Sequence, residues 1–467
     1  MLTKSDFLRY LDAPMHLWAK AHDALEEKSA TLLDQHLREQ GQQVEALARQ
    51  YLEDHIQTIY TQADLLWQFA YNDGRYEVRS DGIVHDLTAD AYDLYEIKSS
   101  TRVKTEHEYD LAFQTLLLEN TFNLRSIYVL HINSNYVLED ELDIAQLFII
   151  DEVTPKINKR REDVKQLRVS AWQVTQMDAP LPEFACTNPK TCPCPSLCHP
   201  KLPVHPIYDL PRIGRKAADL RNQGIVDIRD IPPDFPLNAK QTQHAQVVRS
   251  GQAQVDKTAI GDWLSGLDYP LYFLDYETFG PALPLFPGYQ PYEQVVFQYS
   301  LYTLTSPEAE PKHHACLITS QEDPEPPMAA DLVRHLGPEG TVLVWYAPFE
   351  KGRNTGLARH CPEQADALLG INDRIQDLML PFSSGWFIHP DFHGSASLKA
   401  VLPVLCPELD YTDLQIRDGQ QAMLTWFRLQ QGEFSPEEEA QIRENMLAYC
   451  QRDTYGMVAI WNYLRTI

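Results

Sequence analysis

The chain has 467 residues, and its 66 Asp and Glu residues outnumber its 40 Lys and Arg residues, which gives a formal net charge of −26. This charge has the wrong sign for a protein that binds nucleic acid by bulk electrostatic attraction, so an enzyme of nucleic acids with this composition must rely on metal ions and local basic patches. The length predicts two or three domains. The lack of an apolar run of about 18 residues, or of a basic N-terminus before an apolar stretch, predicts a cytoplasmic protein with no membrane partner.

The N-terminal region predicts two helices. Apolar residues at helical spacing run from Phe7 to Trp18, and a second helical pattern runs from about Thr31 to Ile59. Both helices are interpreted as scaffold. Glu45 in the second helix is either a surface acid, the commoner case for a helical Glu, or a metal ligand.

The pattern changes to period two at Arg75, which predicts a β-hairpin with a first strand to Leu87 and a second strand that ends near Lys98. Asp81 is expected on the first strand, and Glu96 and Lys98 share a face of the second. Two acids and a lysine from neighbouring strands can hold a divalent cation and place an ammonium beside an attacked phosphate. Exposed Glu and Lys are also common on strands, so the pattern by itself leaves a structural role open.

The segment after this hairpin adds to the catalytic interpretation. A predicted helix carries Asp110 and Gln114 on one face, and the apolar strand SIYVLHI follows. Residues 1–200 together resemble the PD-(D/E)XK nucleases of the RecB type, a family that includes CRISPR-associated members. The resemblance implies a restriction-endonuclease-like fold with metal ligands at Asp81, Glu96 and Glu45, a catalytic lysine at Lys98 and the RecB-type glutamine at Gln114.

Four of the eight cysteines lie in the segment ACTNPKTCPCPSLCHP, and none precedes it. In a cytosolic protein this clustering indicates a metal site rather than disulfides. RecB-type nucleases often close their domain with an iron–sulfur cluster that is held by three C-terminal cysteines and one distant N-terminal cysteine. The resemblance therefore implies a [4Fe–4S] cluster on cysteines drawn from Cys186, Cys192, Cys194 and Cys198. Ala13 stands where the N-terminal cysteine is expected, so either Cys194 supplies the fourth thiolate or the site binds Zn²⁺ instead.

The next segment, Leu210–Ile225, resembles a helix-hairpin-helix element, in which a glycine turn presents backbone N–H groups to a phosphate. Arg212, Arg215 and Lys216 make it locally basic and are candidates for nucleic-acid binding. An ordinary helical connector is an equal alternative. The Pro-rich stretch Ile231–Leu237 predicts a linker between the two halves of the chain.

The C-terminal half begins with the apolar strand LYFLDYET, Leu271–Thr278. Asp275 and Glu277 share a face of this strand because successive side chains alternate. Two adjacent carboxylates at the end of a buried strand repel each other, which is costly unless a multivalent cation lies between them. A solvated strand end is the alternative.

Two later elements carry further acids. The predicted strand Thr341–Tyr346 leads into a helix with Glu350 in its first turn. The last helix begins at Ser435 with a capping box, and Asp453 interrupts its apolar stripe one turn after Tyr449. A carboxylate at a core position must be paired or must bind a metal.

These motifs, in this order over residues 268–467, resemble the DEDD exonucleases of the DnaQ type, which have an RNase H-like fold. The chain departs from the commonest pattern with Glu rather than Asp at position 350 and with Ala347 where Asn is frequent. The resemblance implies cleavage from the 3′ end with two Mg²⁺ or Mn²⁺ ions. It implies metal ligands at Asp275, Glu277, Glu350 and Asp453, with Tyr449 orienting the attacking water.

The segment GPALPLFPGYQPYEQ, residues 280–294, is inserted between the first two strands of this half. Its aromatic residues either line the substrate path by stacking on bases or pack over the sheet.

We therefore expect an α/β protein with a PD-(D/E)XK-like domain at 1–200, a helical connector at 201–267 and an RNase H-like mixed-sheet domain at 268–467. The expected function is metal-dependent hydrolysis of phosphodiester bonds by a 3′–5′ exonuclease site and a second, RecB-like site, with DNA favoured over RNA as the substrate. The alternative is a nucleic-acid-binding or scaffold protein in which one or both sites are degenerate.

Overall fold

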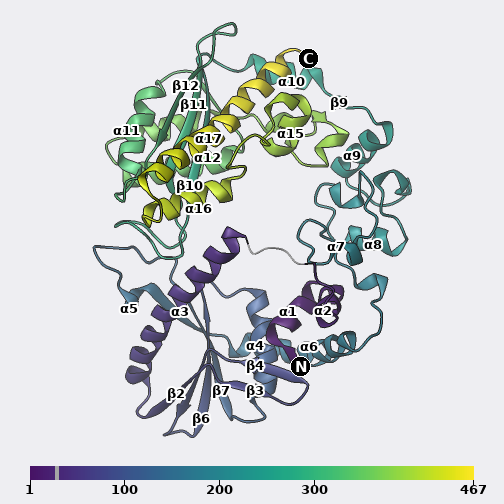
Figure 1. The fold of residues 1–467 in the computed structure, drawn as a ribbon, viewed down its shortest axis with the longest axis vertical. Helices are drawn as coiled ribbons and strands as arrows, with labels where there is room; N and C mark the ends of the chain where they lie inside the picture. Colours follow the sequence, from purple (N-terminus) through teal and green to yellow (C-terminus); the bar gives the residue numbers. More distant parts are fainter. Residues whose placement is uncertain (27–30) are drawn as a thin grey trace. The chain divides into compact units, whose positions relative to one another are not determined.

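The computed structural model describes residues 1–26 and 31–467, and the chain divides into two units. The first unit comprises Met1–Lys201 and Pro281–Tyr292, and the second comprises Leu202–Gly280 and Glu293–Ile467. Each unit combines helices with a five-stranded mixed sheet (Figure 1), so the predicted α/β class is confirmed. In the part of the chain that is described, no helix combines the length and the apolar character needed to cross a membrane.

The main sheet of the first unit has the strand order β2-β5-β6-β7-β8. Its strands are β2 (Ala63–Trp67), β5 (Gly82–Asp86), β6 (Ala91–Lys98), β7 (Leu124–Ile132) and β8 (Phe148–Glu152). All neighbours are antiparallel except β6 and β7, which are parallel and are connected through helix α4 (Thr105–Leu118). A parallel pair needs such a crossover because its strands start at the same edge.

Helices cover both faces of this sheet. Val84 and Tyr95 face α3 (Leu32–Ile59), whose Val44, Ala48, Leu52 and Ile56 are buried against them. Ile83 and Leu94, their neighbours in sequence, belong to the core that contains residues of α1 (Lys4–Asp12), α4 and α6 (Thr154–Thr175). The predicted N-terminal helix is two helices, because Pro14 begins a new one, α2 (Pro14–Ala21), after an extended Ala13.

The predicted first strand of the hairpin is divided between two sheets. Its first part is β4 (Tyr76–Arg79), which pairs with β1 (Leu2–Thr3) and β3 (Ala70–Asn72) in a small separate sheet. Its second part is β5, and Asp81 lies at the bend between them rather than on a strand. Period-two patterning marks both pieces alike, so it does not indicate where the chain changes sheet.

The sheet of the second unit has the order β12-β11-β10-β13-β14. Strands β10 (Leu271–Phe279), β11 (Val295–Leu304) and β12 (Lys312–Leu317) are antiparallel, and β13 (Thr341–Val344) and β14 (Ile375–Asp377) run parallel to β10. Leu271 and Phe273 pack on the last helix, α17 (Pro436–Arg465), which crosses the sheet in Figure 1. The other face packs on α11 (Glu325–His335), α12 (Ala347–His360) and α13 (Ala365–Arg374).

The start of α17 is as predicted. The Ser435 hydroxyl accepts from the backbone N–H of Glu438, whose carboxylate accepts from the backbone N–H of Ser435, and Pro436 opens the helix. These contacts satisfy backbone donors that the first turn leaves without partners.

The segment predicted as connector belongs to the second unit. It contains the short helix α8 (Lys216–Asn222), followed by α9 (Ala239–Ser250) and α10 (Lys257–Ser265). Ile231, from the Pro-rich stretch predicted as a linker, is buried in a small core with Leu220 and Val248. The Pro-rich stretch is thus an ordered part of this unit, because its apolar residues are covered.

The insertion at residues 281–292 belongs to the first unit although it separates two strands of the second. Ala282 is fully buried in the core on the α3 side of the first unit's sheet, and the Tyr292 hydroxyl donates to the Ser99 carbonyl oxygen. The expectation that it packs over the sheet of its own half is therefore corrected, whereas the alternative that its aromatic residues line a substrate path stays a prediction. The aromatic composition indicates a need for burial but not the surface that provides it.

Candidate active sites and metal centre

Four predicted acids of the second unit, Asp275, Glu277, Glu350 and Asp453, lie together and are called the four-acid site below. Asp275 and Glu277 share a face of β10, as alternation predicted, and lie opposite Ser300 and Gln298 of β11. Those two polar residues attach the sheet to α17, since the Ser300 hydroxyl bonds the Thr454 hydroxyl at 2.6 Å and the Gln298 amide donates to the Met446 carbonyl at 2.9 Å. The face that carries both acids is therefore fastened to the helix that carries Asp453.

Glu350 is positioned by a tight turn between β13 and α12. Tyr346 precedes the helix with φ +83°, a left-handed conformation that is costly for a non-glycine residue. The Asp377 carboxylate, at the end of β14, accepts from the backbone N–H groups of Tyr346 at 3.1 Å and Ala347 at 3.0 Å and so supports this turn. Glu350 is only 1% exposed, and its Oε2 has no hydrogen-bond partner among the described residues.

Residues that sequence patterns did not indicate surround Asp453 and Tyr449 of α17. The Tyr411 hydroxyl donates to Asp453 Oδ1 at 2.5 Å, and Lys399 Nζ donates to the Tyr449 hydroxyl at 3.2 Å. Cys450 Sγ lies 3.8 Å from Asp275 Oδ2. Tyr411 lies in an irregular loop and Lys399 in a short helix, so no periodic signal identifies either one.

Burial raises the pKa values of Asp275, Glu277 and Glu350 well above those of ordinary carboxyl groups, and repulsion from neighbouring acids of the site raises them further. Burial also raises the pKa of Asp453, although the Tyr411 hydrogen bond and the charge of Lys399 oppose that change. Burial and the charge of Asp453 raise the pKa of Tyr449, so its hydroxyl stays protonated. The site thus concentrates negative charge that divalent cations would offset.

The first unit brings its predicted residues together in what we call the lysine–acid site. Lys98 Nζ donates to Glu96 Oε1 at 2.7 Å and to Asp110 Oδ2 at 3.0 Å. The Gln114 amide donates to Glu96 Oε2 at 2.9 Å and to Asp110 Oδ1 at 3.0 Å. Lys4 of α1, which sequence patterns did not indicate, adds a second ammonium at 2.9 Å from Glu96 Oε1. Burial tends to raise the pKa of Glu96, but Lys98 and Lys4 lower it below the usual range.

Asp81 and Glu45 line the same cavity of about 390 Å³ as Glu96 and Lys98. Asp81 accepts from the backbone N–H of Ile97 at 2.9 Å. Burial, and then the charge of Glu96, raise the pKa of Asp81 to about 7. Glu45 Oε1 accepts from Arg49 and Gln68, so this carboxylate reaches the cavity already paired.

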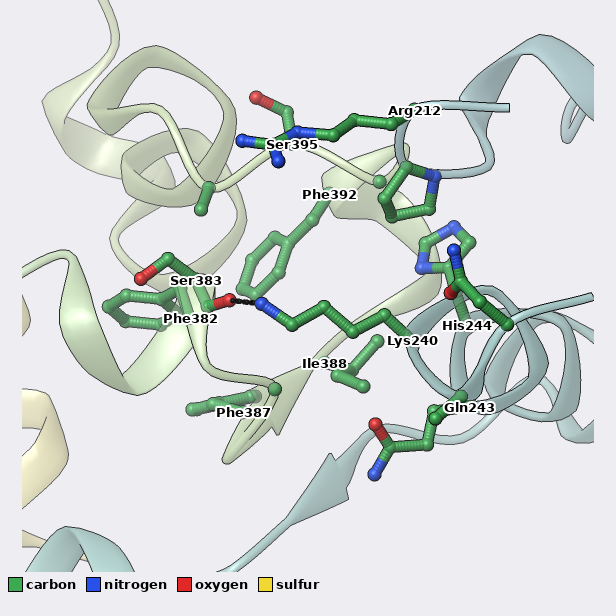
Figure 2. A pocket seen from close by; sticks show the side chains of 16 residues that line it. Arg212, Lys240, Gln243, His244, Phe382, Ser383, Phe387, Ile388, Phe392 and Ser395 are labelled. Carbon is green, nitrogen blue, oxygen red and sulfur yellow. Dashed lines mark hydrogen bonds between the residues drawn. The ribbon is translucent and has the colours of Figure 1, made fainter. Parts of the chain in front are cut away.

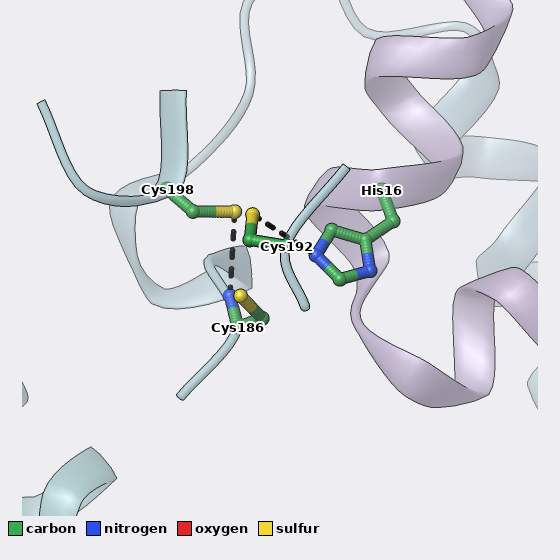
Figure 3. Close-up of side chains that lie close together, drawn as sticks. All are labelled: His16, Cys186, Cys192 and Cys198. Atoms are coloured by element: carbon green, nitrogen blue, oxygen red, sulfur yellow. Dashed lines mark hydrogen bonds between the residues drawn. The ribbon is translucent and has the colours of Figure 1, made fainter. Parts of the chain in front are cut away.

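The cysteine segment forms a third candidate centre, and its composition differs from the prediction (Figure 3). Candidate ligand atoms of His16, Cys186, Cys192 and Cys198 all lie within 4.8 Å of one another, and all four residues are buried. We call them the Cys3His centre. Cys194 contacts Cys198, with the two Sγ atoms 3.8 Å apart, but is not a member of this group. His16 lies three residues after Ala13, where the N-terminal cysteine ligand was expected. This closeness in the sequence was the one feature that could have indicated His16 as a ligand.

The predicted basic residues around position 212 have different surroundings. Lys216 Nζ donates to the Pro236 carbonyl and to Gln241 Oε1, which are contacts within the unit. Arg215 is exposed just before α8. Arg212 lines a cavity of about 680 Å³ whose wall Figure 2 shows. Across this cavity, Lys240 Nζ donates to the Ser383 carbonyl, and Phe382, Phe387 and Phe392 supply apolar surface.

Comparison with known families matches residues 272–397 to DUF2779, which is described as a domain of unknown function. No curated protein matches the chain. No solved structure matches it either. The matched segment contains Asp275, Glu277 and Glu350 and ends before Tyr449 and Asp453. The chain is thus similar to DUF2779 over most of β10 and all of α12, the strand and the helix that supply three members of the four-acid site.

Proposed function

We propose that the protein is a divalent-metal-dependent nuclease and that its second unit is a 3′–5′ exonuclease of the DEDD type. The four-acid site carries this proposal. Its buried carboxylates repel one another, and Glu350 keeps an oxygen without a partner among the described residues. Buried like charges cost stability unless cations offset them, so a purely structural role gives no reason for this arrangement.

The strand order of the second unit supports an RNase H-like fold for this domain. Three antiparallel strands are followed by two that are parallel to the first, with helices on both faces. The acids lie on the first strand, on the helix after the fourth strand and on the last helix, as in the family that the sequence resembles. Fold alone does not assign an activity, so the proposal depends on the acids.

Two Mg²⁺ or Mn²⁺ ions, held by the carboxylates of the four-acid site, would supply an activated water and offset charge on the scissile phosphate. Tyr449 keeps its proton because burial and Asp453 raise its pKa, so it is suited to orient a water and not to remove a proton. The Lys399 ammonium bonds the Tyr449 hydroxyl and lies 5.2 Å from its ring, which restricts how the tyrosine can turn.

The test is digestion of single- and double-stranded DNA and RNA, labelled at either end, with Mg²⁺ or Mn²⁺. We expect stepwise shortening from the 3′ end that EDTA abolishes. Asp453→Asn should lower the rate about a thousandfold, because the remaining acids would not hold two ions in a productive geometry. Glu444→Gln, an exposed acid of the same helix, is the control. Shortening by Asp453→Asn at the parental rate would contradict the proposal.

We also propose a second, RecB-like nuclease activity in the first unit. The network of Glu96, Lys98, Asp110 and Gln114 supports it, as does the crossover through α4 between the parallel strands β6 and β7. Lys98→Ala in the Asp453→Asn background should remove the remaining metal-dependent cleavage. Lys165→Ala, an exposed lysine of the same unit, is the control. Because Lys98 bonds two buried carboxylates, the thermal unfolding of each variant is measured in parallel with its cleavage. Cleavage that Lys98→Ala leaves unchanged would contradict this second proposal.

A scaffold protein with degenerate sites remains the alternative function. Calorimetric titration of Mn²⁺ separates the two, since a scaffold has no need to bind divalent ions at the four-acid site. We expect binding that the Asp275→Asn, Asp453→Asn double variant loses. Identical isotherms for parent and double variant would favour the scaffold.

A further inference from the structure

The Cys3His centre joins two segments of the first unit that are far apart in the sequence. His16 comes from α2, and the cysteines come from the loop that contains the one-turn helix α7 (Pro195–Cys198). The centre lies in a small core that also contains Ala13, Trp18 and Val174. None of its thiols is in a disulfide. Three thiols and an imidazole that are buried and converge in this way make up a ligand set that is common in zinc sites.

The spacing of the donors distinguishes between a single ion and a cluster. A tetrahedral Zn²⁺ with Zn–S bonds of about 2.3 Å and a Zn–N bond of about 2.0 Å places its ligand atoms roughly 3.5–3.8 Å apart. A [4Fe–4S] cube carries its ligands on separate iron corners, which places their donor atoms about 6 Å apart. Here all four donors lie within 4.8 Å of one another, and His16 Nε2 lies 3.5 Å from Cys192 Sγ. The donors fit a single ion and are too close for the cluster.

The surroundings of His16 also suit a ligand. Its Nδ1 lies 2.6 Å from Asp12 Oδ2, so Nδ1–H donates a hydrogen bond to the Asp12 carboxylate and Nε2 is the nitrogen that carries the lone pair. That nitrogen faces the thiols (Figure 3). A carboxylate behind a metal-bound imidazole is a common arrangement, because it fixes both the tautomer and the orientation of the ring.

Hydrogen-bond donors are available for the thiolates. The backbone N–H of Cys186 donates to Cys198 Sγ at 3.4 Å, and His199 Nε2 lies 3.2 Å from Cys186 Sγ. Such donors reduce the charge on sulfur in a site where three thiolates exceed the two positive charges of the ion.

We propose that His16, Cys186, Cys192 and Cys198 bind one structural Zn²⁺ in a tetrahedral site, that Asp12 positions His16, and that Cys194 is not a ligand. This replaces both the iron–sulfur cluster and the four-cysteine ligand set that the sequence suggested. All four coordination positions are occupied by protein, which is typical of structural and not of catalytic zinc. The ion would fasten α2 to the cysteine loop, and the inference does not depend on nuclease activity.

The first test is the metal content of the full-length protein purified without oxygen. We expect one zinc per chain, little iron, no acid-labile sulfide and no brown colour. Replacement by Co²⁺ should produce the strong visible bands of tetrahedral cobalt and a sulfur-to-cobalt charge-transfer band in the near ultraviolet. Only thiolate ligands produce that band, and the measurement uses a Cys450→Ser background so that the thiol beside the four-acid site does not contribute to it. A brown protein with iron and sulfide in cluster proportions would overturn the proposal.

Variants then test the ligand set by competition for the ion with a coloured chelator. Cys198→Ser should release zinc to the chelator at much lower chelator concentration than the parent, whereas Cys194→Ser, its matched control, should retain zinc as the parent does. His16→Cys preserves a ligand and should keep the ion with a more intense cobalt–sulfur band. Asp12→Asn should weaken zinc binding about 10- to 100-fold. Zinc loss from Cys194→Ser, or an unchanged cobalt spectrum in His16→Cys, would contradict the ligand assignment.

Discussion

The two carboxylate sites bury similar groups but balance their charge in different ways. In the lysine–acid site, the ammonium groups of Lys4 and Lys98 bond Glu96 directly, and Lys98 also bonds Asp110. In the four-acid site, burial and mutual repulsion raise the pKa values of Asp275, Glu277 and Glu350. The ammonium group of Lys399 also lies at this site, but its hydrogen bond goes to the Tyr449 hydroxyl and not to a carboxylate.

This difference shows two ways to offset the negative charge of buried carboxylates: with side chains of the protein or with bound cations. In the lysine–acid site two ammonium groups lower the pKa of Glu96, so the Glu96 carboxylate contributes to stability without a metal, whereas burial and the charge of Glu96 raise the pKa of Asp81. The four-acid site keeps its repulsion until protons or divalent cations bind, since a charged group that is removed from water needs a partner. Removing Glu96 from the first site and Asp275 from the second should therefore have opposite effects on stability.

The largest expected change in the free energy of unfolding is at Glu96. Glu96→Gln leaves the ammonium groups of Lys4 and Lys98 without their shared partner and should lower the free energy of unfolding by about 3 kcal/mol. Asp275→Asn removes a source of repulsion and should raise it by about 1 kcal/mol in the absence of metal. Urea denaturation in EDTA measures both, with Glu141→Gln, an exposed acid of the first unit, as the control. Changes of the same sign would remove the contrast between the sites.

Tyr449→Phe tests the four-acid site by its activity instead of its stability. The variant keeps the ring and deletes the hydroxyl that Lys399 and Asp453 contact. We expect the exonuclease rate to fall roughly 10- to 100-fold, the scale of one lost positioning contact. Calorimetry should show Mn²⁺ affinity near that of the parent, because the carboxylates remain. Tyr455→Phe, a partly exposed tyrosine of the same helix, is the control, and a parental rate in Tyr449→Phe would exclude the orienting role.

The smallest expected effect is a pH dependence of stability in the metal-free protein. The raised pKa values of Asp275, Glu277 and Glu350 mean that the folded chain binds more protons than the unfolded chain above about pH 4. The free energy of unfolding should therefore fall as pH rises, and Mg²⁺ should reduce the slope. The difference between the parental and Asp275→Asn profiles, measured upward from about pH 4, isolates the contribution of Asp275 because both proteins carry the same histidines. Parallel profiles would show that Asp275 ionises normally.

Local patterns predicted those features of the candidate sites that depend on neighbours in the sequence. The capping box at Ser435 and Glu438 determines where α17 begins, and the interruption of its apolar stripe identified Asp453 as an unusual buried acid. Alternation along β10 placed Asp275 and Glu277 on one face. Each of these signals comes from a few consecutive turns or residues.

Contacts between distant segments required the tertiary structure. Lys4 and His16 are ordinary residues of N-terminal helices by any local pattern, yet one bonds Glu96 and the other joins cysteines about 170 residues later. The insertion at 281–292 is apolar enough to predict burial, but not to predict that the first unit's sheet buries it.

The sequence by itself determined the kinds of element and the types of side chain available for chemistry, because helical and strand periodicity and capping depend on short stretches of chain. Only the tertiary structure decided which side chains meet. It brought His16 close to Cys186, Cys192 and Cys198, placed Asp81 at a bend between two sheets, and put Asp377 in contact with the turn before the helix that contains Glu350. These contacts depend on how whole helices and strands pack against one another. The packing surfaces combine residues that are far apart in the sequence, so no local pattern predicts them.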